Sequence, residues 1–165
     1  MTNRYDLIKI QEKLQKKLTQ DRYQHTLGVM YTCAALAMCH GCNLERAMVA
    51  GLLHDCAKCI PNDKKISICE KNNIAITEAE RKNPSLLHAK AGVFLAKSKY
   101  DIEDEDILDA IRYHTTGNVD MTLLQKITYL ADYIEPWRNK ATNLPAIRAA
   151  AFCSPARPGY MVCCW

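Results

Sequence analysis

The sequence predicts an all-α fold, a compact helical bundle around one hydrophobic core. Apolar residues recur at spacings of three and four along most of the chain, and no segment shows the apolar–polar alternation typical of a β-strand. A chain of 165 residues can bury a core of its own without disulfide staples. Its 48% apolar and 24% charged residues are typical of an ordinary globular protein.

The first three predicted helices are set by apolar spacing and by residues that begin or end helices. The second covers about residues 22–39 and ends at Gly41, which accommodates the left-handed backbone of a helix end. Asn43 is suited to cap the third helix, which must end before Pro61. The first helix carries apolar residues on one face at Leu7, Ile10, Leu14 and Leu18.

The middle of the chain carries three further start signals. A short helix is expected to begin at residues 62–63. Thr77 and Glu80 form a capping-box pattern, in which each side chain bonds the backbone N–H of the other. Asn83 followed by Pro84 is a suitable cap and first residue for the next helix, because proline has no N–H that would need an acceptor there.

Two helices are predicted in the last third of the chain, over residues 104–113 and 122–134, the second closed by Pro136. We expect a single domain over residues 1–150. Residues 151–165 contain two prolines, a glycine and three cysteines without any apolar periodicity. This segment is predicted to be an irregular or poorly ordered tail.

Charge and composition restrict the partners. The net charge of +4 is too small for a concentrated basic face, so no nucleic-acid partner is expected, although it suits an anionic small substrate. No apolar run approaches the roughly 20 residues that cross a bilayer, so no membrane partner is expected. The first residues also lack the apolar run of a signal peptide. A cytoplasmic protein is predicted, whose nine cysteines are reduced and mostly packed as small hydrophobic residues.

Four of the five histidines lie in or beside apolar helical segments, and two aspartates share such surroundings. A single histidine of this kind is usually a core residue satisfied by a hydrogen bond. Four of them on different helices favour a metal centre instead, because the aspartates beside them are costly to bury unless paired or metal-bound. The candidate ligands are His25, His54, Asp55, His88, His114 and Asp132.

The adjacent pair His54 and Asp55 favours a centre with two ions. Neighbouring side chains on a helix diverge by about a quarter-turn, so the aspartate can bridge two ions while the histidine serves one. Six ligands also exceed the needs of one catalytic ion, which keeps positions open for water and substrate. Imidazole and carboxylate ligands suit iron(II), manganese(II), zinc or cobalt.

These residues follow the order H…HD…D, and the strings around them resemble those of HD-domain phosphohydrolases. The matching segments are RYQHTLGV, GLLHDCAK, LLHAKAG, YHTTG and KITYLADYIEPWR. They are similar to the YqeK-type branch, the symmetrical bis(5'-nucleosyl)-tetraphosphatases. Five such segments in order are specific, whereas an isolated HD dipeptide is not. The resemblance covers residues 4–148 and departs at the carboxyl end, where the family usually continues helically.

The resemblance implies an HD-type helical bundle and a metal-dependent hydrolase of dinucleoside polyphosphates. Diadenosine tetraphosphate would be cleaved symmetrically to two ADP by a hydroxide held between two ions. The implied metal is iron, and ligand chemistry leaves manganese open. Asp55 would bridge the ions. One ion would be held by His25, His54 and Asp132, and the other by His88 and His114.

Lys58 and the string TTG after the last of these histidines are candidates for binding phosphate. Lys58 lies about one helical turn after Asp55 and is, with it, a candidate catalytic residue. A surface lysine is the alternative. Thr115, Thr116 and Gly117 offer hydroxyl and backbone donors, unless they only end a helix.

Four further residues are candidates for contacting a nucleotide. Arg22 and Arg138 can pair with outer phosphates through their guanidinium groups, or form surface ion pairs. Tyr133 and Trp137 can stack on a base, with core packing as the alternative role for Tyr133.

Alternatives remain open for both site and function. The pairs Cys39–Cys42 and Cys56–Cys59 form a rival zinc site. Against it, the second pair is expected on the same apolar helix as His54, which favours reduced core cysteines. An HD-domain nucleotidase, an alarmone phosphodiesterase and a non-catalytic nucleotide-sensing module are alternative functions. A homodimer is also left open.

Overall fold

The computed structural model describes residues 4–152, and that range contains helices and no β-strand, which confirms the all-α prediction. Nine α-helices and one 3-10 helix follow one another in these residues. They are α1 (Leu7–Gln15), α2 (Gln20–His40), α3 (Leu44–Leu53), α4 (Asn62–Lys71), α5 (Glu78–Lys82), η1 (Pro84–Leu87), α6 (His88–Tyr100), α7 (Glu105–Tyr113), α8 (Leu123–Ile134) and α9 (Leu144–Ala151).

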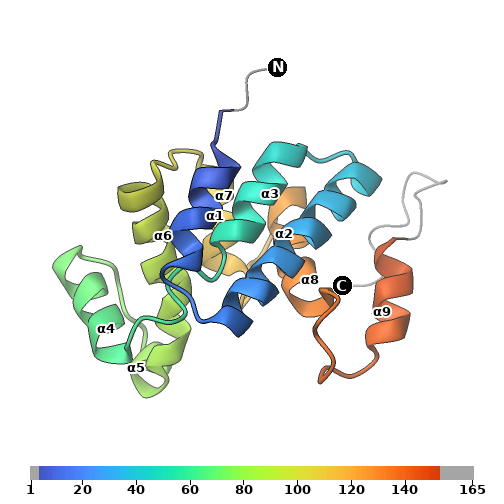
Figure 1. Cartoon of the computed structure of the whole chain (residues 1–165). Coiled ribbons are helices and arrows are strands. Elements are labelled where there is room, and N and C mark those ends of the chain that lie inside the picture. The colour runs from blue at the N-terminus through green and yellow to red at the C-terminus, as the bar shows by residue number, and fades with distance from the viewer. Residues whose placement is uncertain (1–3, 153–165) are drawn as a thin grey trace.

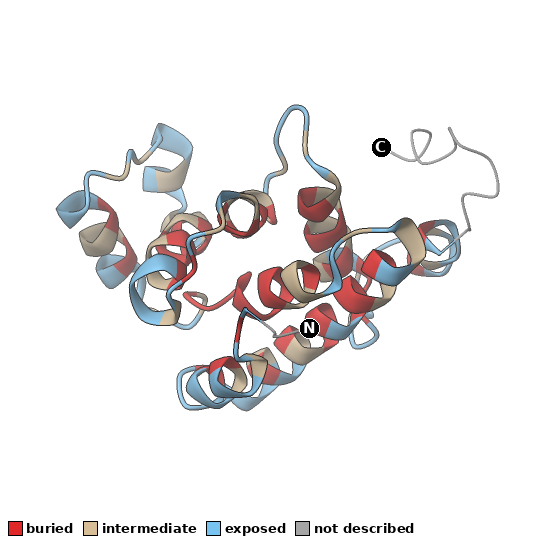
Figure 2. Cartoon of the chain, turned by 90° about the horizontal axis from the view of Figure 1, so that it is seen from above, coloured by how far each residue is buried: buried red, intermediate tan, exposed pale blue. Residues whose placement is uncertain are grey.

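The helices form a bundle with α2 and α3 at its centre (Figure 1). α2 packs against α3 and α8, and α7 packs against α3, α6 and α8. The short helices α4 and α5 lie at one end of the bundle and α9 lies at the other. Seen from above, the buried faces of the central helices turn toward one another (Figure 2). This arrangement brings segments far apart in the sequence to one place in the interior.

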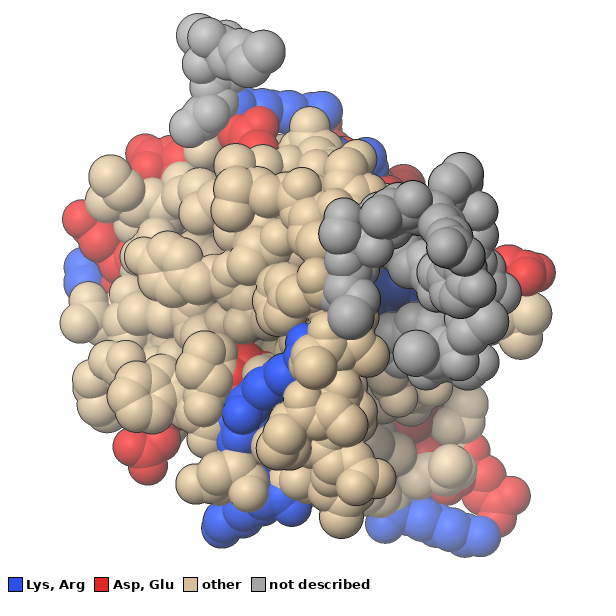
Figure 3. All heavy atoms as spheres, turned by 90° about the vertical axis from the view of Figure 1, so that its right-hand side faces the viewer, with Lys and Arg blue, Asp and Glu red and all other residues tan. Residues whose placement is uncertain are grey.

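The surface carries charges of both signs. On the side where α9 lies, residues other than Lys, Arg, Asp and Glu cover much of the described face, and acidic and basic side chains lie around its rim and in a narrow strip below its centre (Figure 3). Within residues 4–152, every helix is too short or too polar to cross a membrane.

Three of the predicted helix boundaries are confirmed. Gly41 ends α2 with a left-handed backbone at φ 72°. Asn43 caps α3 by accepting a hydrogen bond from the backbone N–H of Arg46. Thr77 and Glu80 make both reciprocal bonds of a capping box at the start of α5. These signals are local, so they act in the same way whatever the tertiary context.

The segment after α3 differs from the prediction. α3 ends at Leu53, and residues 54–59 form a run of tight turns. The ring of His54 donates to a carbonyl in the last turn of α3 and takes an acceptor that a continuing helix would use. The expectation that Cys56 and Cys59 lie on the same helix as His54 is therefore wrong.

The pair Asn83 and Pro84 starts a helix, as predicted, but this is the 3-10 helix η1, and the α-helix begins only at His88. The side chain of Asn83 accepts the hydroxyl of Ser85 at 2.6 Å instead of capping a backbone N–H. The tight turn places His88 at the first residue of α6.

The carboxyl end of the described residues contains a helix that the sequence did not predict. No helix was predicted over residues 139–150, yet α9 forms there with a proline in its first turn. Ala151, the first residue of the predicted irregular tail, is the last residue of α9. Residues 153–165 lie outside the described residues, and the single domain over residues 1–150 remains a prediction.

The packing of α2 against α3 depends on a glycine. A Cβ atom at Gly51 would lie 2.9 Å from Cα of Met30 and 3.0 Å from Sγ of Cys33. The first of these atoms belongs to the backbone of α2 and cannot move aside independently. The same glycine supplies the carbonyl that orients the ring of His54 at 2.7 Å. Close packing at this point therefore fixes a residue of the site described below.

We predict that Gly51→Ala destabilises the protein although alanine favours helices. Overpacking against a backbone atom costs about 1–3 kcal/mol, which exceeds or offsets the roughly 1 kcal/mol gained from helix propensity. Gly92→Ala on α6 is the matched control, because its Cβ would meet a side-chain methyl of Ile111 at 3.3 Å and its nearest backbone atom only at 3.8 Å, an ordinary contact distance. Urea unfolding should place Gly51→Ala well below Gly92→Ala in free energy of unfolding. Equal stability of the two variants would contradict this account of the packing.

Candidate metal centre

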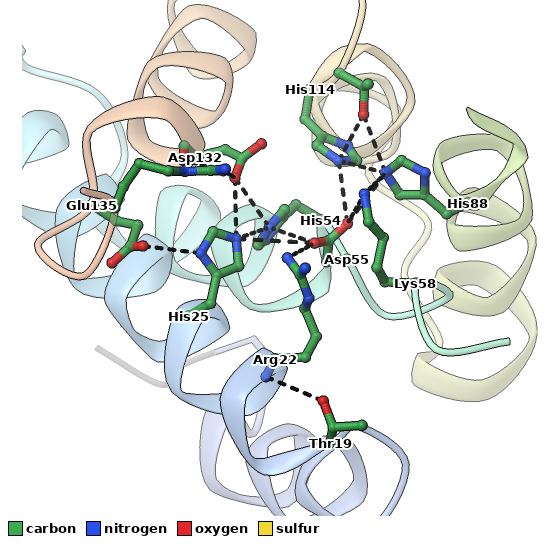
Figure 4. A network of polar contacts seen from close by, with 12 residues as sticks. Thr19, Arg22, His25, His54, Asp55, Lys58, His88, His114, Asp132 and Glu135 are labelled. Carbon is green, nitrogen blue, oxygen red and sulfur yellow. Dashed lines mark hydrogen bonds and ion pairs between the residues drawn. The ribbon is translucent and has the colours of Figure 1, made fainter. Parts of the chain in front are cut away.

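The six residues predicted as metal ligands converge in the interior around Asp55 (Figure 4). His25 comes from α2, Asp132 from α8, His54 and Asp55 from the turn directly after α3, His88 from the start of α6 and His114 from the turn directly after α7. Oδ1 of Asp55 lies 3.2 Å from Nε2 of His88 and 3.5 Å from Nε2 of His114. Its Oδ2 lies 3.5 Å from Nε2 of His54 and 3.9 Å from Nε2 of His25. Oδ1 of Asp132 completes the cluster, 3.1 Å from Nε2 of His25.

The ligand atoms separate into two groups that share Asp55. One group consists of His25, His54 and Asp55, and the other of Asp55, His88 and His114, with the atoms of each group within 4.8 Å of one another. One carboxylate oxygen of Asp55 faces each group. The donor atoms, imidazole nitrogen and carboxylate oxygen, are those that divalent transition metals prefer. The cluster is therefore compatible with a divalent metal centre.

Hydrogen bonds determine which ring nitrogen of each histidine is free. Nδ1 of His54, His88 and His114 lies 2.7, 2.6 and 2.7 Å from the carbonyl oxygens of Gly51, Ser85 and Ile111. A carbonyl can only accept, so each Nδ1 carries the proton and each Nε2 keeps its lone pair. All of these lone pairs point into the cluster.

The Nε2 atoms of these rings face one another in pairs, with too few hydrogen-bond donors nearby to satisfy all of their lone pairs. Nε2 of His54 lies 3.3 Å from Nε2 of His25, and Nε2 of His88 lies 3.1 Å from Nε2 of His114. Oδ1 of Asp55 is buried and has no hydrogen-bond partner. The nearby Nε2 of His88 cannot serve it, because the ring proton is on Nδ1. Facing acceptors repel unless a cation lies between them, so this donor set fits divalent ions.

The protonation states also suit metal binding. Burial raises the pKa of Asp55. When the surrounding rings also carry a proton on Nε2 in place of a metal ion, the positive charge of His54 and the hydrogen bonds from His114, His54 and His88 outweigh burial, and the pKa lies well below its usual value. The pKa of Asp132 is lowered in the same way: burial raises it, and this is opposed chiefly by the hydrogen bond that a doubly protonated His25 ring donates from Nε2. Burial lowers the pKa of His88. At neutral pH the two carboxylates are ionised and His88 is uncharged, which are the forms that bind metals.

Several of the predicted substrate-binding residues border the cluster. Nη1 of Arg22 lies 2.7 Å from Oδ2 of Asp55. Nζ of Lys58 lies 3.2 Å from Nε2 of His88 and 3.7 Å from Oδ1 of Asp55. Both side chains are about a third exposed, at 30% and 35%, so their charges also face the open side of the cluster. The hydroxyl of Thr115 lies 3.2 Å from Nε2 of His88.

Arg138 also belongs to this border. Its Nη2 donates to Oδ1 of Asp132 at 2.6 Å, so it forms an ion pair with a member of the cluster. Beside it is a cleft of about 750 Å³, whose lining includes Arg22, His25 and Arg138. Trp137 also lines this cleft, with 72% of its surface exposed.

Three of the residues predicted to bind substrate make their contacts away from the cluster. The hydroxyl of Tyr133 donates to the carbonyl of Thr142 at 3.4 Å. The hydroxyl of Thr116 donates to the carbonyl of Gly117, which ends the turn after α7 at φ 67°. Thr116 and Gly117 therefore form the turn that ends the helix, which was the alternative role for the TTG string, whereas Thr115 lies at the cluster.

Glu135 is the residue of the site that sequence reasoning missed. Its side chain is only 2% exposed, and Oε1 lies 3.1 Å from Nδ1 of His25. The signal was an acidic residue between Ile134 and Pro136, directly after an apolar helix. Such a residue is usually exposed at a helix end, so the sequence did not single it out.

The rival zinc site is not assembled in the described residues. Cys56 is buried and its thiol lies 3.6 Å from the carbonyl of Gly92. Cys59 is exposed, whereas Cys39 and Cys42 are intermediate. Within residues 4–152, the groups of three or more metal-binding side chains are the two at Asp55, and neither contains a cysteine.

Comparison with known proteins identifies the family. The family described as "HD domain" matches residues 22–137, which extend from α2 to the loop after α8 and include all six residues of the cluster. The chain therefore belongs to the HD-domain family of metal-dependent hydrolases. A crystal structure of a protein from Clostridium acetobutylicum, described as a predicted HD superfamily hydrolase involved in NAD metabolism, matches with a TM-score of 0.85 and 44% identity. The match covers 90% of this chain and 78% of that chain.

The relatives point to one branch of the family. The symmetrical bis(5'-nucleosyl)-tetraphosphatase of Bacillus subtilis is 43% identical over 76% of this chain and 67% of its own length. The protein of the same name from Halalkalibacterium halodurans is 45% identical over 73% of this chain and 64% of its own length. The chain thus spans about two thirds of the length of these relatives. The branch predicted from the sequence motifs is confirmed.

The two ligand groups predict a specific pattern of metal loss. Wild-type protein purified anaerobically should carry about two divalent ions per chain, one for each group. Asp55→Ala should lose both, because Asp55 belongs to both groups, whereas His88→Ala should lose only one. Cys56→Ser is the matched control at a buried position and should keep both. Elemental analysis measures this directly. A single zinc that survives Asp55→Ala but is lost in Cys56→Ser would contradict the assignment.

Proposed function

We propose that this chain hydrolyses dinucleoside polyphosphates at a centre of two divalent ions, with diadenosine tetraphosphate cleaved symmetrically to two ADP. The observation that carries the proposal is the convergence of imidazole Nε2 lone pairs on the buried Asp55, with Arg22 and Lys58 beside it. The relatives from Bacillus subtilis and Halalkalibacterium halodurans, which are named for this activity, support the choice of substrate.

In this proposal Asp55 would serve both ions. His25, His54 and Asp132 would hold one ion, and His88 and His114 would hold the other. When bound, ions of this kind lower the pKa of a coordinated water and offset the charge of phosphate oxygens. Iron is the proposed metal, as the family resemblance implies, and manganese is the alternative that the same ligands suit.

Arg22 and Lys58 are proposed to bind the phosphates that face the cluster. Each carries a positive charge close to Asp55 and is partly open to solvent. In the reaction, an oxygen from water bonds to a phosphorus atom next to the central bridging oxygen, and the bond to that bridging oxygen breaks. The departing ADP is already a good leaving group, so compensation of its charge matters more than a strong general acid.

The remaining contacts are assigned by position. Thr115 is proposed to donate its hydroxyl to a phosphate oxygen, since it lies between the cluster and the surface. Arg138 is proposed to reach an outer phosphate from the cleft. The phosphate-binding roles of Thr116 and Gly117, and base stacking by Tyr133, remain predictions that no contact described above supports.

The predicted partners complete the proposal. We propose a nucleotide as the physiological partner, in the cytoplasm. The expectation that nucleic acid and membranes are not partners, and the open possibility of a homodimer, remain predictions. Fractionation of cells and sedimentation analysis of the purified chain test the compartment and the oligomeric state.

Product analysis with diadenosine tetraphosphate tests the proposed function. Metal-loaded wild-type protein should release ADP as the sole nucleotide product, two molecules for each substrate consumed. In water labelled with oxygen-18, a single turnover should place the label in one of the two ADP molecules. Release of AMP with ATP would contradict symmetrical cleavage. Faster hydrolysis of mononucleotides or alarmones would support the rival enzyme functions, and tight binding without turnover would support the sensing module.

Lys58 provides a test of charge compensation. We predict that Lys58→Met lowers kcat about 100-fold or more, the typical effect of losing one preorganised donor to developing charge. Methionine keeps most of the side-chain volume, so the fold should be unaffected. Lys64→Met at an exposed position of α4 is the matched control and should retain wild-type kcat. Steady-state kinetics with the same substrate measure both, and a wild-type kcat in Lys58→Met would contradict the role.

A further inference from the structure

The ring of His25 is oriented differently from the other three rings. His54, His88 and His114 each lie at a helix end or in a turn, where Nδ1 can donate to the carbonyl three residues earlier. His25 lies in the first half of the long helix α2 (Gln20–His40), where backbone groups already use the neighbouring carbonyls. Its orientation must therefore come from another part of the chain.

Glu135 supplies this contact. Oε1 of Glu135 lies 3.1 Å from Nδ1 of His25, and its Oε2 accepts the backbone N–H of Trp137 at 2.7 Å. Both carboxylate oxygens are thus engaged, although the side chain is only 2% exposed. Gly28, one turn after His25, leaves the space that the carboxylate fills, because a Cβ there would lie 2.7 Å from Oε2. Glu135 therefore has one closely fitted position.

The backbone of the Glu135 segment is held by Arg148 of α9. Nε of Arg148 donates to the carbonyl of Ile134 at 2.8 Å. Its Nη2 donates to the carbonyls of Glu135 and Arg138 at 2.7 and 2.8 Å. One guanidinium group thus joins the last carbonyl of α8 to two carbonyls of the segment that follows it. Arg148 lies beyond the residues 22–137 that match the HD-domain family.

We propose that Glu135 is a positioning residue that holds His25 with Nε2 directed at the metal centre, and that Arg148 holds Glu135 in place. A carboxylate on the outer nitrogen of a metal-binding histidine fixes the ring and makes it a better ligand. This inference rests on the proposed function. It extends the functional unit to α9, because Arg148, which holds Glu135 in place, lies on that helix.

Manganese(II) titration tests the role of Glu135 without substrate. Wild-type protein should bind two ions, and Glu135→Ala should weaken one of them about 10- to 100-fold while the other keeps its affinity. Glu135→Gln should be weakened less, because its amide oxygen can still accept from Nδ1 of His25. Glu103→Gln is the carboxylate control, with its side chain 87% exposed, and should behave as wild type.

A double-mutant cycle shows whether Glu135 acts through His25. In the background of His25→Ala, adding Glu135→Ala should cause no further loss of affinity. In the background of His88→Ala, it should remove most of the binding that remains. Equal effects in both backgrounds would overturn the proposal and indicate a general structural role.

The role of Arg148 is tested in parallel. Arg148→Ala should weaken the same ion as Glu135→Ala but to a smaller extent, whereas Arg81→Ala, at an exposed position, should not. In metal-free protein, nitrogen-15 NMR should find the His25 proton on Nδ1 in wild type and a mixture of tautomers in Glu135→Ala. Wild-type affinities and an unchanged tautomer in Glu135→Ala would overturn this inference alone. A wild-type protein that binds no manganese would instead overturn the proposed function.

Discussion

The structure depends on how four imidazole rings are held around one buried carboxylate. Each ring has its Nδ1 engaged by an acceptor, so each Nε2 presents a lone pair to the space around Asp55. Without cations, two pairs of these nitrogens would face each other as acceptors at 3.3 and 3.1 Å. A positive charge between them converts this repulsion into coordination. The contacts that orient the rings thus determine where a ligand binds in this site and that the ligand must be positively charged.

The bundle orients the rings by ending two helices at the site. α3 and α7 both end directly before a histidine of the cluster, so their last carbonyls are available to orient the rings. The carboxyl ends of helices also carry partial negative charge, which adds to that of the two aspartates and favours cations. Close packing of α2 against α3 at Gly51 fixes the spacing between His25 and His54. Arg22 and Lys58 balance part of the negative charge and leave the open side of the site suited to phosphate.

The sequence predicted the parts of this arrangement that are local or that repeat a family pattern. Caps such as Asn43 and Thr77 act within one turn, and the six ligands stand in recognisable strings. Glu135 was missed because its partner His25 lies 110 residues earlier, a separation that no local pattern records. The contacts that Arg148 of α9 makes were missed because they join it to carbonyls 10 to 14 residues earlier, which is beyond the range of any helix-capping or periodicity pattern. The end of α3 was misplaced because the His54 ring, and not a proline or glycine, competes for its last turn.

The central claim is that two ions flank Asp55. Crystals grown anaerobically with iron and measured at the iron absorption edge test it most directly. The account predicts two anomalous peaks, one within about 2.0–2.3 Å of the ring nitrogens of His25 and His54, the other equally close to those of His88 and His114. Asp55 should contact both. A single peak, or peaks at the cysteines with no density beside Asp55, would contradict it.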